Sequence, residues 1–380
     1  MNSARLHAAS ELPYVRRTTA TTEELLAGAF EALLEAGGLE ARDVDGLGVA
    51  SFTLKPDRCI DMAWRLGLNI RWSLDDGHGG ASGVNMLRHA IAAIECGHAR
   101  HIALLAGDVF GPDDFKELAA NYNGTTRQYL APLGIANPNT LFALLTQRHM
   151  RKHGLERADY GALAVGQRNW ASANPNAVYR SPLSLEDYLA APRVADPLCI
   201  YDCVPVVAGA NAILLSHVSA LPAGSPAIRI KAIDCNYNFD DQSGDGLTTG
   251  LRAISDRLFA NAGVRREELD LVSVYDDYPV MALVQLEDLG IVAPGELRSF
   301  LNDRVLAGRF PLNTSGGQLS AGQAGAAGGL HGLTEAALQL LGRAGERQLS
   351  KADRALVSGY GMVEYRYGMC ANAAILERAQ

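Results

Sequence analysis

Two phenols and two carboxylates lie within four consecutive residues in the segment Tyr275-Asp-Asp-Tyr278. An apolar run precedes them and an apolar segment with helical spacing follows, so we expect them where a strand ends and a helix begins. Because ligands of α/β proteins bind at the carboxyl ends of strands, Tyr275, Asp276 and Asp277 are candidates for moving a proton. A structural alternative stays open, in which the two aspartates cap the following helix and one tyrosine packs in the core.

Glycine-rich stretches at residues 76–83, 313–329 and 358–361 are the other segments able to support chemistry. Each falls between a strand-like run and a helix. Glycines let backbone N–H groups converge on a ligand, and the start of a helix adds a partial positive charge that suits an oxyanion. None is followed by the Gly-Lys-Ser/Thr of a phosphate-binding loop, and the first lacks the Gly-x-Gly-x-x-Gly order, so nucleotide binding is disfavoured.

Alternating helix and strand patterns predict the elements that position these residues. Helices are expected at 22–36, 83–96, 140–153, 157–173, 246–262, 278–289 and 326–341, and strands at 44–51, 101–106, 204–216, 227–234, 271–274, 355–358 and 373–377. This order predicts an α/β protein of two similar halves that meet near residue 223. Residues 110–193 are richer in Pro, Asn, Tyr and Gly, and we interpret them as an insertion over the active centre.

Composition indicates a folded protein with a large core. The chain has 380 residues, a net charge of −8 and 48% hydrophobic residues, which argues against general disorder. No basic run offers a phosphate backbone a local attraction, so nucleic acid is not expected as a partner. The N-terminus has no secretory pattern and no apolar run approaches the length of a membrane span, so we expect a cytoplasmic protein that does not bind membranes.

The six cysteines are scattered without a Cys-x-x-Cys pair. At this chain length they are typical of reduced, buried thiols rather than of a disulfide framework. We therefore expect no metal site in the chain.

Four segments resemble motifs of the thiolase superfamily, in the family's order. Residues 313–329 resemble its NxxGGxxAxGHPxGASG stretch, and Tyr275-Asp-Asp-Tyr278 resembles the HDxF segment of its sterol-carrier and lipid-transfer branch. Residues 79–83 lie where thiolases carry a Cys-Gly-Ser-Gly loop, and 202–212 are similar to the DCxPxSDGAAA strand that closes the family's first half. The resemblance covers about residues 20 to 378.

The resemblance implies a five-layered αβαβα fold of two βαβαβαββ halves, here residues 1–223 and 224–380. It also implies a homodimer and an acyl thioester substrate, with coenzyme A as part of the substrate and no cofactor bound covalently. Several relatives of this branch work with a small zinc-ribbon and OB-fold protein, which implies such a partner here; any zinc would belong to it.

The chain departs from thiolases at the residues that catalyse their reaction. The position of the nucleophilic cysteine falls at Gly80 or a neighbour, and no cysteine lies between Cys59 and Cys96. Gln323 replaces the histidine of the GHP motif and Tyr275 replaces that of HDxF. Without a thiolate nucleophile, an acyl-enzyme cannot form through cysteine.

In these departures the chain is most similar to the thiolase-like aldolases of steroid side-chain degradation. Those enzymes cleave a β-hydroxyacyl-CoA by a retro-aldol reaction without an acyl-enzyme, and they use tyrosines where thiolases use histidines. One departure from them is that a tyrosine tends to occupy the position of Gln323. The resemblance implies a carbon–carbon lyase of catabolism.

A retro-aldol reaction assigns roles to the candidate residues. Tyr275 would take the proton of the β-hydroxyl, oriented by Asp276 or Asp277. The enolate oxygen would face N–H groups around Gly80 and Ala81, helped by Gln323 or Asn313.

Three further candidates complete the predicted site. Tyr360 is a second phenol or else a turn aromatic packed on the surface, with Gly361 beside it. His78 contacts substrate or is a loop histidine bonded to backbone. For Gln323 the structural alternative is an amide that satisfies backbone groups at a helix start.

Two other functions stay open. One is an acyltransferase of Claisen or retro-Claisen type, in which a partner or substrate supplies the thiol. The other is a non-catalytic acyl-CoA-binding subunit of a two-protein complex.

Overall fold

The computed structural model describes residues 3–121, 123–135, 137–240, 243–364 and 367–379. Within them, a nine-stranded sheet has the order β3-β2-β4-β7-β1-β8-β11-β10-β9. The first five strands in that order come from the first half of the chain and the last four from the second half. One residue pair, Leu6 with Ile228, connects β1 to β8 and so joins the two parts. The strands are β1 (Ala4–Glu11), β2 (Gly46–Ala50), β3 (Trp72–Asp76), β4 (His101–Asp108), β7 (Gly209–His217), β8 (Ile228–Tyr237), β9 (Leu271–Ser273), β10 (Arg354–Glu364) and β11 (Tyr367–Arg378).

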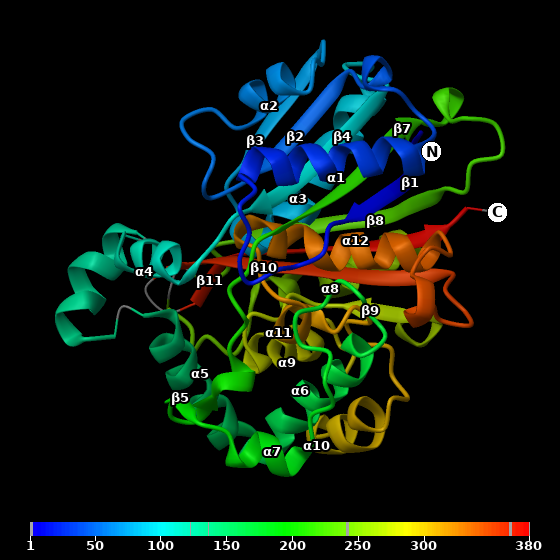
Figure 1. Ribbon diagram of the computed structural model, residues 1–380. Coiled ribbons are helices and arrows are strands. Elements are labelled where there is room, and N and C mark those ends of the chain that lie inside the picture. The colour runs from blue at the N-terminus through cyan, green and yellow to red at the C-terminus, as the bar shows by residue number, and fades with distance from the viewer. Residues whose placement is uncertain (1–2, 122, 136, 241–242, 365–366, 380) are drawn as a thin grey trace.

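Three buried cores define the layers of the molecule. A central core contains α3 (Ser82–Glu95) and α12 (Gly328–Leu340), which pack against strands of both halves. A second core lies between the first half of the sheet and the helices α1 (Thr22–Gly37) and α2 (Cys59–Arg65). A third core packs α8 (Gly250–Ala262) and α9 (Pro279–Asp288) on the second half (Figure 1). The predicted five-layered αβαβα fold is confirmed.

The first turns of α1 and α3 differ in whether a side chain of the protein already caps their backbone N–H groups. At α1, the Thr21 side chain accepts from the Glu24 N–H and the Glu24 carboxylate accepts from the Thr21 N–H, so the helix supplies its own cap. At α3, no side chain caps the first turn, and the helix follows the 3-10 turn Gly79–Ala81 in the interior. The first N–H groups of α3 therefore lie at a buried end without intrahelical acceptors.

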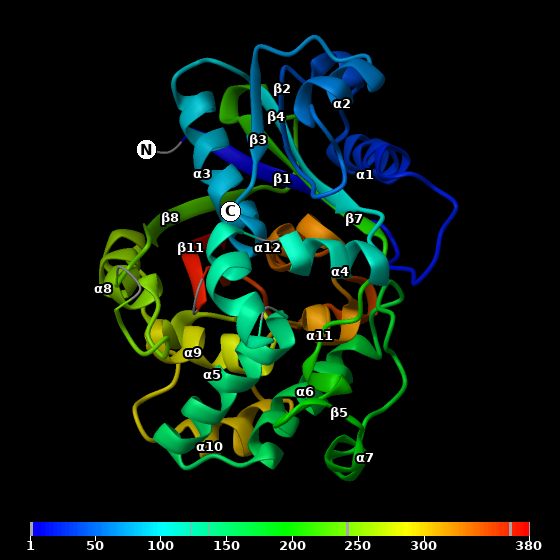
Figure 2. The same cartoon turned by 90° about the vertical axis from the view of Figure 1, so that its left-hand side faces the viewer.

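The predicted insertion lies between β4 and β7 and packs on the other half of the molecule. It contains α4 (Pro112–Asn121), α5 (Pro138–His153), α6 (Arg157–Ala171) and α7 (Leu185–Ala190). Side chains of α5 and α6 share the third core with α9, and Figure 2 shows α4 and α5 in front of the central layer. The boundary at residue 223 falls between β7 and β8, and the division into halves 1–223 and 224–380 stays a prediction.

Two strands of the nine-stranded sheet were not predicted from the sequence, and a third begins later than expected. β1 is built largely from small and polar residues, and β3 ends in two aspartates, so neither shows an apolar run. The strand predicted at 204–216 begins only at Gly209. No described helix is long and apolar enough to cross a membrane.

A buried ionic group ties β1 to the second half. Arg347 lies 3.2 Å from a Glu11 oxygen and 2.9 Å from a Glu335 oxygen. All three side chains are at most 5% exposed. Nearby, His331 contacts the Tyr14 hydroxyl and Ser315, and burial lowers the pKa of His331 to about 4. His331 is therefore neutral and has a structural role.

Replacing Arg347 with methionine is expected to destabilise the protein by about 3–5 kcal/mol, because it leaves two carboxylates buried without their cation. The free energy of unfolding is measured by urea denaturation. Arg343→Met, at an exposed position, is the control. Equal stability of the two variants would contradict a role for the Arg347 ion pairs.

Candidate active site

Gly80 lies where no side chain can be placed. A Cβ atom added there would collide with the carbonyl oxygen of Tyr360 and with the aromatic ring of Tyr275. The turn that carries Gly80 starts at Gly79, whose φ of 56° is in the left-handed region. The place expected for a nucleophilic side chain, at the buried start of α3, is therefore filled by a phenol ring from the other half.

Tyr275, Asp277 and Gln323 form one hydrogen-bonded group beside Gly80. The Gln323 amide nitrogen lies 2.8 Å from the Tyr275 hydroxyl oxygen and also donates to the Asp277 carboxylate. The Tyr275 hydroxyl in turn hydrogen-bonds the Asp277 carboxylate. The structure thus brings together three predicted residues, with a phenol between a carboxylate and an amide donor.

Burial raises the pKa of Asp277 to about 7, against the opposing effect of hydrogen bonds from Tyr275 and Gln323. Both protonation states of this carboxyl are accessible near neutral pH. A general base works best when its pKa lies near the operating pH. Asp277 is therefore suited to receive a proton through Tyr275.

Asp276 points elsewhere and has a structural role. Its carboxylate accepts from the Gln318 N–H at 3.0 Å and from the Gln167 side chain at 2.9 Å. Gln318 lies in the first turn of α11 (Gly317–Ala321), so Asp276 caps that helix. Of the two aspartates left open by the sequence, the geometry selects Asp277 as the partner of Tyr275. The structural alternative expected both aspartates to cap the helix that follows them in the sequence, which is α9. Asp276 caps α11 instead.

Tyr275, Asp277 and Gln323 line a cavity of about 80 Å³, whose lining consists of a polar wall and an apolar wall. The polar wall consists of Gly80, Tyr275, Asp277, Gln323 and Gly361. The insertion supplies most of the apolar wall, and the start of α9 supplies Tyr278 and Met281. The residues of the insertion are Phe110, Phe115, Leu118, Ala119, Pro138 and Phe142. Six residues of the predicted insertion line this cavity, while its role as a cover of the active centre stays a prediction. These apolar residues were not singled out in the sequence, because nothing in the insertion's pattern separates them from ordinary core positions.

Asn313, Tyr360 and Ala81, which were also predicted for the site, do not line this cavity. The Asn313 amide accepts from the Val274 N–H at 2.8 Å and donates to the Val274 carbonyl at 3.1 Å, so it holds the end of β9. The Tyr360 ring is 2% exposed and packs in the third core from strand β10, so it is not the surface-packed turn aromatic of the sequence-based alternative. Ala81 donates its N–H to the His78 carbonyl at 3.1 Å, which removes it as an oxyanion donor.

His78 turns away from the cavity. Its Nδ1 lies 3.2 Å from an Asp76 oxygen, and its ring lies 5.4 Å from that of Tyr237. The hydrogen bond with Asp76 raises the pKa of His78. His78 is thus a loop histidine held by a carboxylate, and its predicted contact with substrate has no support in this arrangement.

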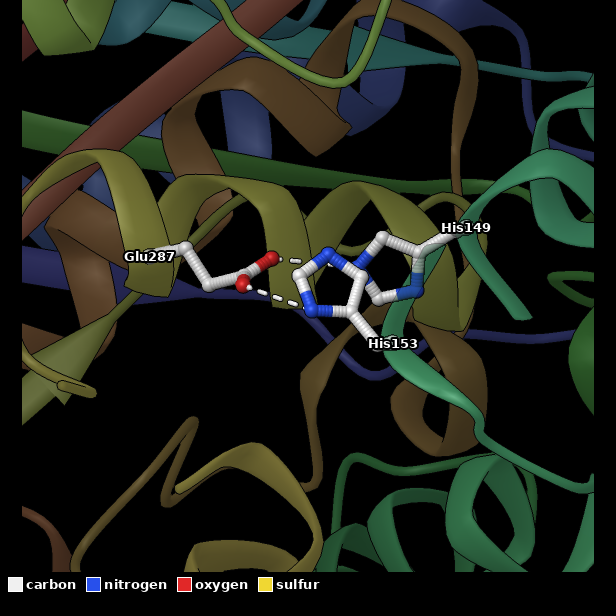
Figure 3. Close-up of side chains that lie close together, drawn as sticks. All are labelled: His149, His153 and Glu287. Carbon is white, nitrogen blue, oxygen red and sulfur yellow. Dashed lines mark hydrogen bonds and ion pairs between the residues drawn. The ribbon is translucent and has the colours of Figure 1, made fainter. Parts of the chain in front are cut away.

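The cysteines nearest the site are not activated. Burial, with the charge of Asp202, raises the pKa of the Cys203 thiol to about 12, and burial raises that of Cys370 to about 11. Both thiols are protonated at neutral pH and are poor nucleophiles. Among the described residues, the group able to hold a metal ion is His149 and His153 of α5 with Glu287 of α9, none of which lines the cavity beside Tyr275 (Figure 3).

Comparisons with known proteins agree with this architecture. Residues 235–378 match the family model described as thiolase C-terminal domain-like. The chain is 29% identical over 337 residues to 17-hydroxy-3-oxo-4-pregnene-20-carboxyl-CoA lyase of Mycobacterium tuberculosis, covering 83% of this chain and 86% of that protein. It is 27% identical over 343 residues to acetyl-CoA acetyltransferase of Methanothermobacter thermautotrophicus, covering 86% and 88%. A solved structure described as Ltp2-ChsH2(DUF35) aldolase superposes with a TM-score of 0.83 at 24% identity, covering 99% of this chain and 98% of that one.

Gly80→Ala is expected to destabilise the protein by about 1–3 kcal/mol, because the added Cβ must displace either a backbone carbonyl or the Tyr275 ring. The thermal unfolding midpoint measures the effect. Gly77→Ala is the control, since a Cβ there has no neighbour within 4 Å. Equal midpoints for the two variants would show that the phenol does not occupy this space.

Proposed function

We propose that this thiolase-like chain is a carbon–carbon lyase that cleaves a β-hydroxyacyl-CoA by a retro-aldol reaction, without an acyl-enzyme. The position of the Tyr275 ring against Gly80 carries the proposal, because it puts a proton-transfer group where acyl transfer would need a thiolate. The lyase and aldolase named among its relatives support the same reaction class. From the lyase relative, we infer a steroid-type acyl-CoA as the substrate class.

Sequence similarity alone does not separate a lyase from an acyltransferase here. The chain is 29% identical to the lyase and 27% identical to the acetyltransferase, over similar shares of its length. The site favours the lyase, because its polar wall contains a phenol, a carboxyl and an amide and no cysteine. A retro-aldol reaction needs proton transfer and enolate stabilisation, which such groups supply.

In the proposed reaction, the β-hydroxyl of the substrate gives its proton to the Tyr275 oxygen while the Tyr275 proton moves to the Asp277 carboxylate. The Cα–Cβ bond breaks, a carbonyl forms at Cβ, and the bonding electron pair becomes the thioester enolate. Gln323 donates to both Tyr275 and Asp277 and so holds the two side chains next to each other. The stored proton then returns through Tyr275 to Cα, which completes the release of the shortened acyl-CoA and of the ketone or aldehyde.

The enolate oxygen is assigned to the backbone at Gly80 and Gly361, which line the cavity next to Tyr275. This place lies at the N-terminal end of α3, where the helix dipole stabilises negative charge. The apolar wall from the insertion would hold the acyl group.

A partner protein and a homodimer belong to the same proposal. The aldolase structure that this chain resembles is described as a complex of Ltp2 with ChsH2 (DUF35), which supports a second protein. We infer a small zinc-ribbon and OB-fold partner that delivers the coenzyme A end of the substrate, and we infer that the chain itself is dimeric. Copurification with a zinc-ribbon protein encoded beside it tests the first inference.

Tyr275→Phe and Asp277→Asn are each expected to lower kcat by about 10²- to 10⁴-fold, because each removes one carrier of the proton. Cleavage is followed by mass spectrometry of the shortened acyl-CoA and the released carbonyl compound, with a panel of β-hydroxyacyl-CoA thioesters. Tyr129→Phe, on an exposed tyrosine, is the control. Unchanged turnover in Tyr275→Phe would exclude this mechanism.

The pH dependence of kcat/KM is expected to show an acidic limb with an apparent pKa near 7. Asp277 must be deprotonated to accept the proton, and burial raises its pKa to about 7, so activity falls as the pH drops through that value. A profile flat between pH 6 and 8 would show that Asp277 is not the base.

Stability has the opposite pH dependence. Because the pKa of Asp277 is raised from 3.8 to about 7, the folded state binds more protons than the unfolded state between those values, and stability falls as the pH rises through them. Asp277→Asn removes this cost. At pH 8 it is expected to melt at or above the temperature of wild type although it is inactive, with Asp113→Asn on the surface as the control.

A further inference from the structure

Helices α5 and α9 run side by side in the same direction and contact each other at both ends. Near their starts, the rings of Phe142 and Tyr278 stack with centroids 4.5 Å apart at the wall of the cavity. Near their ends, His149 and His153 of α5 converge on Glu287 of α9 (Figure 3). The mechanism proposed above uses none of these three residues.

The three side chains have the separations of a metal site. His149 Nε2 lies 3.1 Å from one Glu287 oxygen, and His153 Nδ1 lies 3.4 Å from the other. One ligand atom from each residue lies within 4.8 Å of the other two. Zinc binds imidazole nitrogen and carboxylate oxygen at about 2.0–2.2 Å, so neighbouring ligands of a tetrahedral ion are about 3.3 Å apart. A small inward movement of His153 completes the fit.

The helix geometry explains why the two imidazoles meet. Residues four apart lie on the same face of a helix, one turn from each other, so His149 and His153 project in the same direction from the last two turns of α5. Their ring centroids are 4.5 Å apart. Glu287, in the last turn of α9, reaches them from the neighbouring helix.

A second residue orients the buried ligand. His149 is fully buried, and its Nδ1 lies 2.7 Å from the Tyr160 hydroxyl. Metal-bound histidines commonly donate their other ring N–H to such a partner, which leaves the second nitrogen free to bind the ion. Tyr160 thus holds His149 in the orientation in which Nε2 faces Glu287.

Ions have a route to this group. His153 and Glu287 line a cavity of about 590 Å³, and the buried His149 lies next to them, with its Nε2 3.1 Å from a Glu287 oxygen. Lys152, Arg252 and Arg266 also line the cavity. A water molecule or a small anion from the cavity would complete the coordination.

We propose that His149, His153 and Glu287 bind one divalent transition-metal ion, with zinc the best fit, and that the ion fastens the insertion to α9. Two histidines and one carboxylate with a fourth position open are a known zinc ligand set. This inference replaces the expectation, drawn from the cysteines alone, that the chain has no metal site. It does not depend on the proposed lyase reaction.

The test measures zinc binding by the full chain, purified without any partner because a zinc-ribbon protein would bring its own ion. After dialysis against a chelator, wild type is titrated with Zn²⁺ by calorimetry, and bound metal is counted by mass spectrometry. One ion per chain is expected, together with a higher unfolding temperature in its presence. His153→Gln and Glu287→Gln are each expected to weaken binding by at least about 100-fold, and Tyr160→Phe by about 10-fold.

His98→Gln, on an exposed histidine at the end of α3, is the matched control and is expected to bind zinc as wild type does. Circular dichroism verifies that each variant is folded. Co²⁺ supplies a second measurement, since its visible absorption reports a tetrahedral nitrogen and oxygen environment. Absence of binding by wild type at micromolar zinc, or equal binding by wild type and the double variant His153→Gln/Glu287→Gln, would overturn the proposal.

Discussion

The contact between the Tyr275 ring and the backbone of Gly80 is the constraint on which the rest of the site depends. A side chain at the start of α3 and a phenol at the end of β9 cannot occupy the same volume. Once the phenol is there, the electropositive end of the helix faces a proton carrier instead of a thiolate. The chemistry available at this place changes while the fold around it is kept.

Asp276 and Asp277 show how adjacent residues acquire different roles after a strand ends. Burial raises the pKa of each carboxyl to about 7. Asp276 is enclosed by N–H donors of α11 and of Gln167, which leaves it no access to the cavity. Asp277 is bonded to groups that themselves line the cavity, and for this reason the proposed mechanism gives it the proton. The partners of each carboxylate, and not its pKa, separate the capping residue from the proposed proton acceptor.

The sequence predicted the layers and the meeting of Tyr275, Gln323 and Gly80, because those features rest on backbone motifs whose order constrains the fold. It did not predict side-chain directions. Tyr360 and Gly361 are neighbours on β10, and the alternation of a strand sends the first into a core and leaves the second on the cavity. The spacing of His149 and His153 was visible in the sequence. Glu287 was not recognisable as their partner, because only packing of α5 on α9 brings it to them.

The two helices that carry this trio also carry part of the cavity wall. α5 bears Phe142 at its start and the histidines at its end, and α9 bears Tyr278 and Glu287 in the corresponding places. An α-helix is stiff along its axis. An ion bound at the far ends of α5 and α9 would therefore restrict how Phe142 and Tyr278 can move at the opposite ends. The polar wall rests on the sheet and on the central helices, while most of the apolar wall rests on the insertion, which packs on α9 through the third core and would gain a second attachment from the proposed ion. Attachment at the far ends of the two helices would keep the charged metal ligands away from the cavity, so the side that the insertion lines stays apolar except for the Tyr278 hydroxyl, which donates to Asn139.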